Sequence, residues 1–295
     1  MRYNLPMSRI LDPRKIKGLA VDLDGTLLLP EGVLGNKTKN ILQKLMSGGM
    51  QIIISTGRSV ESSEKYRSAI DAHGPMVFYN GAEVVDVPSG KLLHTNYINM
   101  DVVDFCTVIA RELDVHYQVY LPAGISPDTG ESDPQQKWGL LAAEKFGEEA
   151  KMYHKHTGLV PAVKDLKKIA ALPFDGCIKG MYIADPSKHD EIRRRINQRF
   201  GGSVTVMRSY PTFLEIINNG VSKGEGLKIA MEHRGLKPEE VIAFGDEEND
   251  VSMFTVASYA CVPENAREVI RAQADYVYKP NTEEGLAQYL EEIFL

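Results

Sequence analysis

The sequence is poor in cysteine, in long apolar runs and in surplus positive charge, and each shortage argues against a class of protein. Only three cysteines occur among 295 residues, at Cys106, Cys177 and Cys261, and no CxxC pair is present. A disulfide-stapled miniprotein, a zinc ribbon and a dithiol redox centre are therefore not expected. We predict buried or half-buried thiols in a reducing compartment.

No apolar run approaches the roughly 18 residues of a membrane span, and residues 1–17 hold no apolar stretch typical of a signal peptide. We therefore expect a cytoplasmic protein with no membrane partner. The 34 basic residues are outnumbered by 40 acidic ones, so the formal charge is −6, which argues against a nucleic-acid partner. The sequence leaves the oligomeric state open.

The composition is otherwise ordinary for a folded chain, with 43% hydrophobic and 25% charged residues. Short apolar runs alternate with amphipathic stretches at both ends of the chain, as in a doubly wound, Rossmann-like, mostly parallel sheet. The predicted elements are strands at residues 17–22, 52–54, 76–79, 241–244 and 259–262, and helices at 36–47, with Asn36 as its cap, 59–72, 222–233, 249–257, 265–272 and 282–294.

The middle of the chain has a different pattern, in which strands and helices do not alternate regularly. A hairpin is predicted at residues 83–95, followed by strands at 115–120, 177–183 and 204–208 and helices at 101–113 and 190–200. We therefore predict an α/β fold whose core domain, residues 1–92 and 217–295, is split by an inserted α+β cap domain, residues 93–216.

The sharpest motif is Asp22-Leu23-Asp24-Gly25-Thr26, directly after the first predicted strand. Side chains at i and i+2 point to one face of an extended strand, so Asp22 and Asp24 are expected to aim into the crevice at its C-terminal end. Two close carboxylates repel unless a cation lies between them or one holds a proton, and Mg²⁺ prefers such oxygen ligands. A solvated turn is the plainer alternative, which the preceding buried strand disfavours.

Three further motifs are expected at the same edge of the sheet. Ser55–Arg58 offers a hydroxyl and free N–H groups to a phosphate, and Lys223 offers a point charge to an anion. Asp246 and Asp250 follow the strand at 241–244 and could face the crevice of Asp22. No GxxxxGK[ST] is present, so a P-loop NTPase is not indicated.

In this order, DLDGT, STGR, the lysine of VSKGEGL and GDEENDVSMF resemble the four motifs of the haloacid dehalogenase superfamily. Asn80-Gly81-Ala82 and FLEIINNGVSKG make the chain similar to the Cof-type hydrolases of that superfamily, which include sugar-phosphate phosphatases with a type IIB cap. The resemblance extends over nearly the whole chain from Lys17, and it implies the α/β core and inserted cap expected above.

The resemblance also implies a mechanism. Asp22 would be the nucleophile that forms an aspartyl-phosphate, and Asp24 would give a proton to the leaving alcohol and take one from water. Mg²⁺ would be held by Asp22, the backbone carbonyl of Asp24 and Asp246, with Asp250 close by. Whether Asp250 touches the metal or only orients ligands is left open by the sequence.

Phosphate binding is assigned by the same resemblance. Thr56 and Lys223 would hold the phosphoryl oxygens, with Asn249 assisting. Thr56 is preferred to its neighbour Ser55 because it directly precedes Gly57 in the motif. Arg58 is expected either to line the cap interface or to pair with an acid of a helix.

These features predict a Mg²⁺-dependent phosphomonoester hydrolase whose partner is a small phosphorylated metabolite, expected to be a sugar phosphate, and whose cap closes to exclude water. Two alternatives remain at this stage. A phosphomutase on the same scaffold would pass the phosphoryl group to a second sugar hydroxyl. A non-enzymatic phospho-acceptor or metabolite sensor would keep it, although an acid/base group two residues after the nucleophile argues against that.

Overall fold

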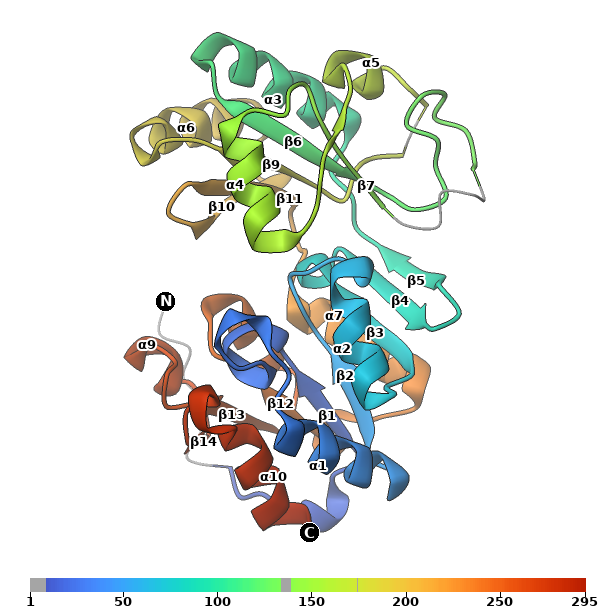
Figure 1. Ribbon diagram of the computed structural model, residues 1–295, viewed down its shortest axis with the longest axis vertical. Coiled ribbons are helices and arrows are strands. Elements are labelled where there is room, and N and C mark those ends of the chain that lie inside the picture. Colours follow the sequence, from blue (N-terminus) through green and yellow to red (C-terminus); the bar gives the residue numbers. More distant parts are fainter. Residues whose placement is uncertain (1–8, 134–138, 174) are drawn as a thin grey trace. The chain divides into compact units, whose positions relative to one another are not determined.

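The computed structural model describes residues 9–133, 139–173 and 175–295. The chain divides into two compact units (Figure 1). The core unit takes the described residues up to His94 together with Ser222–Leu295, and the cap unit is Thr95–Val221. In the part of the chain that is described, no helix is both long and apolar enough to cross a bilayer.

The core unit is built on a five-stranded parallel sheet in which β1 is an inner strand. The strand order is β14-β13-β12-β1-β2, with β1 hydrogen-bonded to β12 on one side and to β2 on the other. The bounds are β1 Gly18–Val21, β2 Gln51–Ile54, β12 Val241–Phe244, β13 Tyr259–Pro263 and β14 Tyr276–Tyr278. The chain leaves β1 towards β2 but continues from β12 towards β13, so the winding direction reverses between β1 and β12. That reversal is where open α/β sheets bind ligands.

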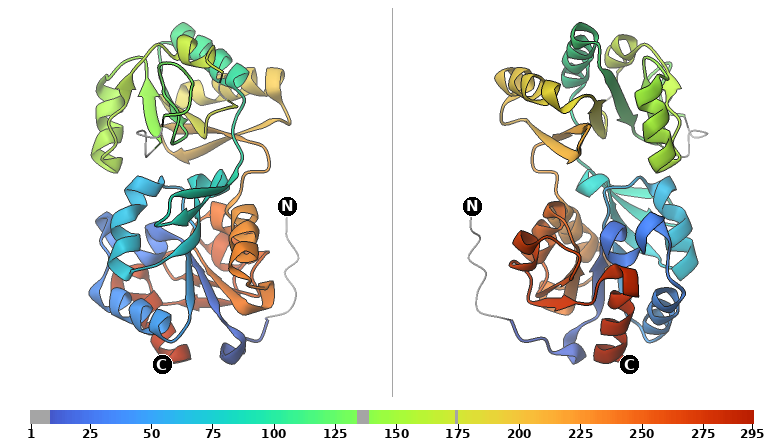
Figure 2. Two further views of the ribbon diagram at one scale, coloured as in Figure 1. Left: turned by 90° about the vertical axis from the view of Figure 1, so that its right-hand side faces the viewer. Right: turned by 60° about the vertical axis from the view of Figure 1, so that its left-hand side comes forward.

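Helices cover both faces of this sheet, which explains why β1 and β12 are buried along their whole length. Figure 2 shows α7, Lys223–Arg234, on one side and α1, Asn36–Ser47, with α2, Val60–Ile70, on the other. α7 packs on α8, Val251–Phe254, and α1 packs on α10, Gly285–Phe294. The short helix α9 spans Glu268–Arg271.

The third predicted strand exists but does not extend the parallel sheet. β3, Gly74–Phe78, forms a three-stranded sheet with β4, Glu83–Val87, and β5, Lys91–Thr95. It meets the end of β2 only through a single parallel bridge between Ser55 and Val77. Before that bridge, the Arg234 guanidinium joins the two strands, because it donates to the Ile52 carbonyl of β2 and to the Pro75 carbonyl of β3, both at 3.0 Å. β3 takes its own ladder from the following hairpin.

The prediction that Asn36 caps the first helix is wrong. Asn36 is the first helical residue, and Gly35 occupies the cap position with no side chain to offer. The acceptor comes instead from Glu284, whose Oε2 accepts hydrogen bonds from the Thr38 backbone N at 2.7 Å and the Thr38 hydroxyl at 2.9 Å. A side chain 246 residues away thus satisfies the free N–H groups of the first turn.

The cap unit is a separate α+β layer structure. Its strands run in the order β10-β11-β9-β6-β7-β8. Their bounds are β6 His116–Leu121, β7 Leu140–Ala143, β8 Ala162–Val163, β9 Lys179–Ile183, β10 Val204–Tyr210 and β11 Phe213–Asn218. The helices are α3 Met100–Leu113, α4 Glu148–Thr157, α5 Leu166–Ala170 and α6 His189–Phe200.

The core of the cap unit lies between its sheet and three of its helices. Apolar residues of α3, α5 and α6 join one buried cluster with alternate residues of β6, such as Tyr117 and Val119. Cys106 and Cys177 belong to that cluster, and Cys261 is buried in the core unit; all three thiols are free. The sequence did not predict β7, β8, β11, α4 or α5.

Candidate active site

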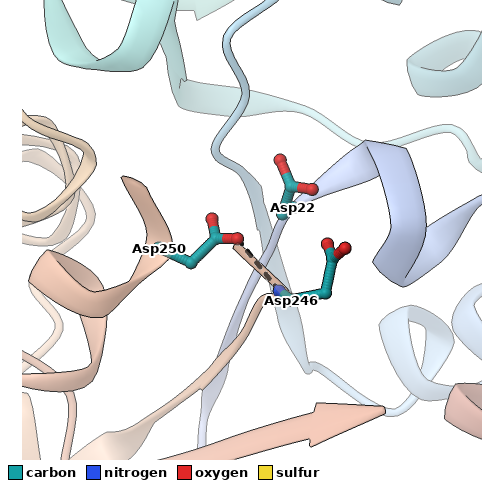
Figure 3. Close-up of side chains that lie close together, drawn as sticks. All are labelled: Asp22, Asp246 and Asp250. Atoms are coloured by element: carbon teal, nitrogen blue, oxygen red, sulfur yellow. Dashed lines mark hydrogen bonds between the residues drawn. The ribbon is translucent and has the colours of Figure 1, made fainter. Parts of the chain in front are cut away.

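The two central strands end in acidic residues at the reversal point of the sheet. Val21 of β1 lies opposite Phe244 of β12, so Asp22 and the turn that contains Asp246 leave the sheet side by side. Asp22, Asp246 and Asp250 each offer a carboxylate oxygen, and these oxygens lie within 4.8 Å of one another (Figure 3). All three residues are buried. The sequence correctly predicted that these two distant motifs meet.

Lys223 joins this cluster from the first position of α7. Its Nζ donates to Asp22 Oδ1 at 2.5 Å and to Asp250 Oδ1 at 2.6 Å, and its side chain is only 1% exposed. The helix can begin here because the Ser222 side chain accepts from the Glu225 backbone N. Burial alone would lower the pKa of the Lys223 ammonium, but Asp22 and Asp250 outweigh it and the pKa rises. Lys223 is therefore charged.

One lysine does not neutralise three buried carboxylates. Burial raises the pKa of Asp22 well above its usual value against the pull of Lys223, and Asp250 and Asp246 raise it further. Burial and the neighbouring Asp250 likewise raise the pKa of Asp246 to about 7. A second cation would relieve this repulsion. The donor set is entirely carboxylate oxygen, which fits a hard divalent ion such as Mg²⁺.

Asp250 differs from the other two acids because both of its carboxylate oxygens accept hydrogen bonds from the protein. Its Oδ1 accepts from Lys223, and its Oδ2 accepts from the backbone N of Asp246 and of Glu247, both at 3.0 Å. Figure 3 shows the bond from Asp246 to this carboxylate. Asp250 thereby fixes both the lysine and the turn that carries Asp246.

Asp246 is held by the loop that follows the nucleophile candidate. Thr26 donates from its hydroxyl to Asp246 Oδ1 at 2.9 Å. The residue before Thr26, Gly25, has φ +83°, and a Cβ at this glycine would lie 2.1 Å from Asp246 Oδ2. Only glycine therefore allows the two acidic turns to come this close. Sequence reasoning gave Thr26 no role, although its place inside DLDGT was a signal.

Asp24 does not lie in the carboxylate cluster, contrary to the expectation from i, i+2 spacing. The strand ends at Val21, and the chain then forms a turn instead of continuing extended. Its backbone hydrogen bonds join residues five apart, from Leu27 N to Asp22 O and from Leu28 N to Leu23 O. The Asp24 carboxylate instead makes two bonds with the Arg58 guanidinium, at 2.6 and 2.7 Å, and its side chain is 55% exposed. Arg58 thus pairs with an acid, but the partner is Asp24, whose backbone is not helical, and not the helix acid that was expected.

The remaining phosphate-binding candidates, Thr56 and Asn249, lie around the turn at Asn80. Thr56 is fully buried, and its Oγ1 accepts from the Arg58 backbone N at 3.1 Å. The Asn249 side chain donates to Asn80 Oδ1 at 3.0 Å, and the Asn80 backbone N donates to the Thr56 carbonyl. Asn80 has φ +59°, as an asparagine tolerates. It links Thr56 to Asn249, a role that sequence reasoning missed.

Carboxylates, a buried lysine and threonine hydroxyls at the switch point of a parallel sheet are typical of proteins that transfer a phosphoryl group. The model of the haloacid dehalogenase-like hydrolases matches residues 19–290, and the chain belongs to this family.

Named relatives agree with this family. A Bacillus subtilis 5-amino-6-(5-phospho-D-ribitylamino)uracil phosphatase is 28% identical over 94% of this chain and 97% of its own length. An HMP-PP phosphatase of Enterobacter sp. is 26% identical over 88% of each chain. The family and the names of these relatives together show that the protein is a hydrolase of the phosphatase class.

Solved structures agree on the fold. A Thermotoga maritima protein, 29% identical, matches with a TM-score of 0.81 over 95% of this chain and 98% of its own. A sugar phosphatase of HAD subclass IIB, 20% identical, matches with a TM-score of 0.74 over 94% of this chain and 98% of its own. The chain therefore has the Rossmann-like core and inserted cap of that subclass.

Proposed function

We propose that the protein is a Mg²⁺-dependent phosphomonoester hydrolase that acts on a small phosphorylated metabolite of the sugar-phosphate class. The observation that carries the proposal is the Asp22 carboxylate, buried against Lys223 and beside Asp246 at the switch point of the sheet. A nucleophilic carboxylate can approach an anionic phosphate only where positive charge lies nearby. This site supplies one cation, Lys223, and carboxylate ligands for a second, the metal ion.

In this proposal the site residues share the binding of the metal and of the phosphoryl group. Asp22, Asp246 and the backbone carbonyl of Asp24 would hold the metal, which when bound neutralises phosphoryl charge. Lys223, Thr56 and Asn249 would bind the phosphoryl oxygens. Asp250, whose lone pairs are engaged by Lys223 and two backbone N–H groups, would position the site rather than bind the metal directly.

The reaction would run in two displacements. An oxygen of Asp22 attacks phosphorus while the ester oxygen departs and takes a proton from the Asp24 carboxyl, which leaves an aspartyl-phosphate and a free alcohol. Water then attacks the same phosphorus and gives its proton to Asp24, releasing inorganic phosphate and restoring Asp22. For both steps the Asp24 side chain must leave Arg58 and turn to the reacting oxygen.

The relatives support the substrate class. They are named for the removal of phosphate from a ribitylamino-uracil phosphate and from HMP-PP, both small metabolites. The sugar-phosphate assignment rests on the resemblance to Cof-type enzymes and on the structural neighbour named as a sugar phosphatase. A panel of phosphorylated sugars and nucleoside precursors, assayed for release of inorganic phosphate, tests it.

The central prediction concerns Asp22→Asn. Because an amide does not attack phosphorus, Mg²⁺-dependent hydrolysis of p-nitrophenyl phosphate should fall by at least about a thousandfold with no loss of folding. Asp71→Asn is a matched control, since Asp71 is an exposed C-cap with φ +60° where asparagine is equally suited. Substantial turnover by Asp22→Asn would contradict the proposal. Transfer to a second sugar hydroxyl without phosphate release would instead indicate a mutase, and a stable phospho-protein a sensor.

A further inference from the structure

The loop that carries Asp22 has little hydrogen bonding of its own. Between Asp22 and Leu28, two backbone hydrogen bonds that each join residues five apart close the loop. They run from Leu27 N to Asp22 O at 3.2 Å and from Leu28 N to Leu23 O at 2.8 Å. Gly25, in its middle, has φ +83°, a region that glycine enters and leaves at little cost. The loop therefore needs outside contacts to hold one shape.

Two asparagines from the last third of the chain supply these contacts. Asn265 donates from Nδ2 to the Gly25 carbonyl at 3.0 Å. Asn281 donates from Nδ2 to the Leu28 carbonyl at 2.8 Å. The two are also joined, because the Asn281 backbone N donates to Asn265 Oδ1 at 2.9 Å.

This arrangement ties the loop to the far edge of the sheet. Asn265 follows β13 and Asn281 follows β14, so both come from the same C-terminal edge as Asp22 but from strands farther along the sheet. Neither side chain is acidic or basic, so neither adds charge to the site. Their whole effect is on the direction in which the loop's carbonyl groups point.

We infer that Asn265 and Asn281 form a clamp that sets the metal-binding geometry of the Asp22–Leu28 loop. The inference rests on the proposed function, in which the carbonyl of Asp24 is a metal ligand. With the Gly25 carbonyl held, the peptide units on either side of Gly25 cannot rotate freely. The neighbouring Asp24 carbonyl keeps its direction, and Thr26 keeps its bond to Asp246.

The clamp explains why these residues matter although they touch no reacting atom. Groups that orient metal ligands commonly change metal affinity or activity by about 10–100-fold when removed. Asn265 is exposed, so its side chain contributes little to packing, and its loss separates loop orientation from global stability. Asn281 is buried, so its removal would mix the two effects.

The test compares Asn265→Ala with Gln273→Ala. Gln273 is a matched control in the same unit, because its exposed amide donates to the Val269 carbonyl at 3.0 Å, away from the site. For each variant, Mg²⁺ alone is titrated by calorimetry, kcat and KM for p-nitrophenyl phosphate are measured, and the unfolding midpoint is recorded. We expect Asn265→Ala to weaken Mg²⁺ binding and lower kcat by about tenfold each, with KM and the midpoint close to those of the control.

A second variant, Asn265→Asp, removes only the donor. It keeps the oxygen that accepts from Asn281 and the size of the side chain, but it places an oxygen against the Gly25 carbonyl. The added negative charge would by itself attract Mg²⁺, so weaker binding in this variant cannot arise from charge. We expect losses at least as large as in Asn265→Ala.

The outcomes separate the clamp from the proposed function. If the unaltered protein binds Mg²⁺ and releases phosphate while both Asn265 variants match the control, the clamp is overturned and the phosphatase stands. A fall in activity that follows a lower unfolding midpoint, with Mg²⁺ binding unchanged, also overturns it. If the unaltered protein binds Mg²⁺ but hydrolyses nothing, the proposed function fails, and weakened Mg²⁺ binding in the variants still supports the clamp.

Discussion

Asp246 and Asp250 lie four residues apart in one turn, but their carboxylates have different partners. Asp246 accepts one hydroxyl bond, from Thr26, whereas both oxygens of Asp250 accept bonds from Lys223 or from backbone N–H groups. Of the roughly four lone-pair sites of a carboxylate, the bonds to Asp246 take one and the bonds to Asp250 take three, so Asp246 has more room for a metal. This difference assigns metal binding to Asp246 and positioning to Asp250 in the proposed mechanism.

Asp246→Asn and Asp250→Asn should therefore separate metal affinity from catalysis. We expect Asp246→Asn to weaken Mg²⁺ binding by at least about tenfold, because a charged ligand is lost. Asp250→Asn should change the Mg²⁺ dissociation constant by less than about threefold but lower kcat, because Lys223 loses a partner and its direction. Calorimetry with Mg²⁺ alone and steady-state kinetics measure the two effects. Equal weakening by both variants would show that Asp250 binds the metal directly.

The raised pKa of Asp246 predicts a pH-dependent stability for the metal-free protein. Its pKa is about 7 in the folded chain against an ordinary value of 3.8, so between these values the folded state binds more protons than the unfolded one. The free energy of unfolding should then fall as pH rises from about 4 to about 7 and level off above. Asp22, whose pKa is also raised, acts in the same direction.

Chemical denaturation in EDTA across about pH 5 to 8 measures this slope, and saturating Mg²⁺ should abolish it because the metal replaces the proton. Asp246→Asn should reduce the slope of the metal-free profile and leave the part due to Asp22, while the exposed-site control Asp71→Asn keeps the full slope. A stability that rises with pH over this range would contradict the assignment of the raised pKa.

At the scale of helices and strands, the sequence predicted where the central strands end better than it predicted which strands pair. Apolar runs that stop at Asp22 and at Gly245 predicted β1 and β12, and the position of the acidic motifs at the C-terminal ends of parallel strands predicted that they meet. β14, with three residues, is too short to give a periodic signal. Between β2 and β3 the Arg234 guanidinium takes the place of ladder bonds, and a side chain 182 residues from Ile52 has no local sequence pattern.

The cap of α1 shows the same limit. An N-cap within the sequence is visible as a polar residue before a helix, and Asn36 looked like one. The residue that satisfies the helix is Glu284, brought there by the docking of α10 on α1. Contacts across 246 residues follow from the fold and have no local pattern.

This tertiary cap predicts that Glu284 contributes to stability. Glu284→Ala should lower the free energy of unfolding by about 1 kcal/mol, the usual value of an N-cap acceptor. Glu284→Gln keeps an acceptor oxygen and should recover most of the loss. Glu283→Ala, at an exposed neighbouring position, is the control, and urea denaturation monitored by circular dichroism is the measurement. Equal effects at Glu283 and Glu284 would contradict the cap.

At the scale of the whole molecule, the two units have separate hydrophobic clusters, and the candidate metal ligands all belong to one of them. A ligand stabilises the structure that binds it, by about 2.7 kcal/mol at a hundredfold excess over its dissociation constant. Mg²⁺ should therefore slow hydrogen exchange in β1, β12 and the turns that follow them.

The cap sheet, by contrast, should exchange at the same rate with and without Mg²⁺. Hydrogen-exchange mass spectrometry of the full chain, with Mg²⁺-free and Mg²⁺-saturated samples compared, resolves the two regions. Asp246→Asn should remove the protection in the core unit. A uniform slowing across both units would show instead that the metal acts on the chain as a whole.

The interrupted order of the core sheet has a consequence for how the chain is made. β1 is synthesised early, but one of its two neighbours in the sheet is β12, in which Val241 pairs with Gly18. The contiguous cap unit, Thr95–Val221, leaves the ribosome in between. Because domains fold as units during synthesis, the cap can be complete while β1 still has an open edge. The nucleophile candidate near the beginning of the chain is thus assembled among the last parts of the protein.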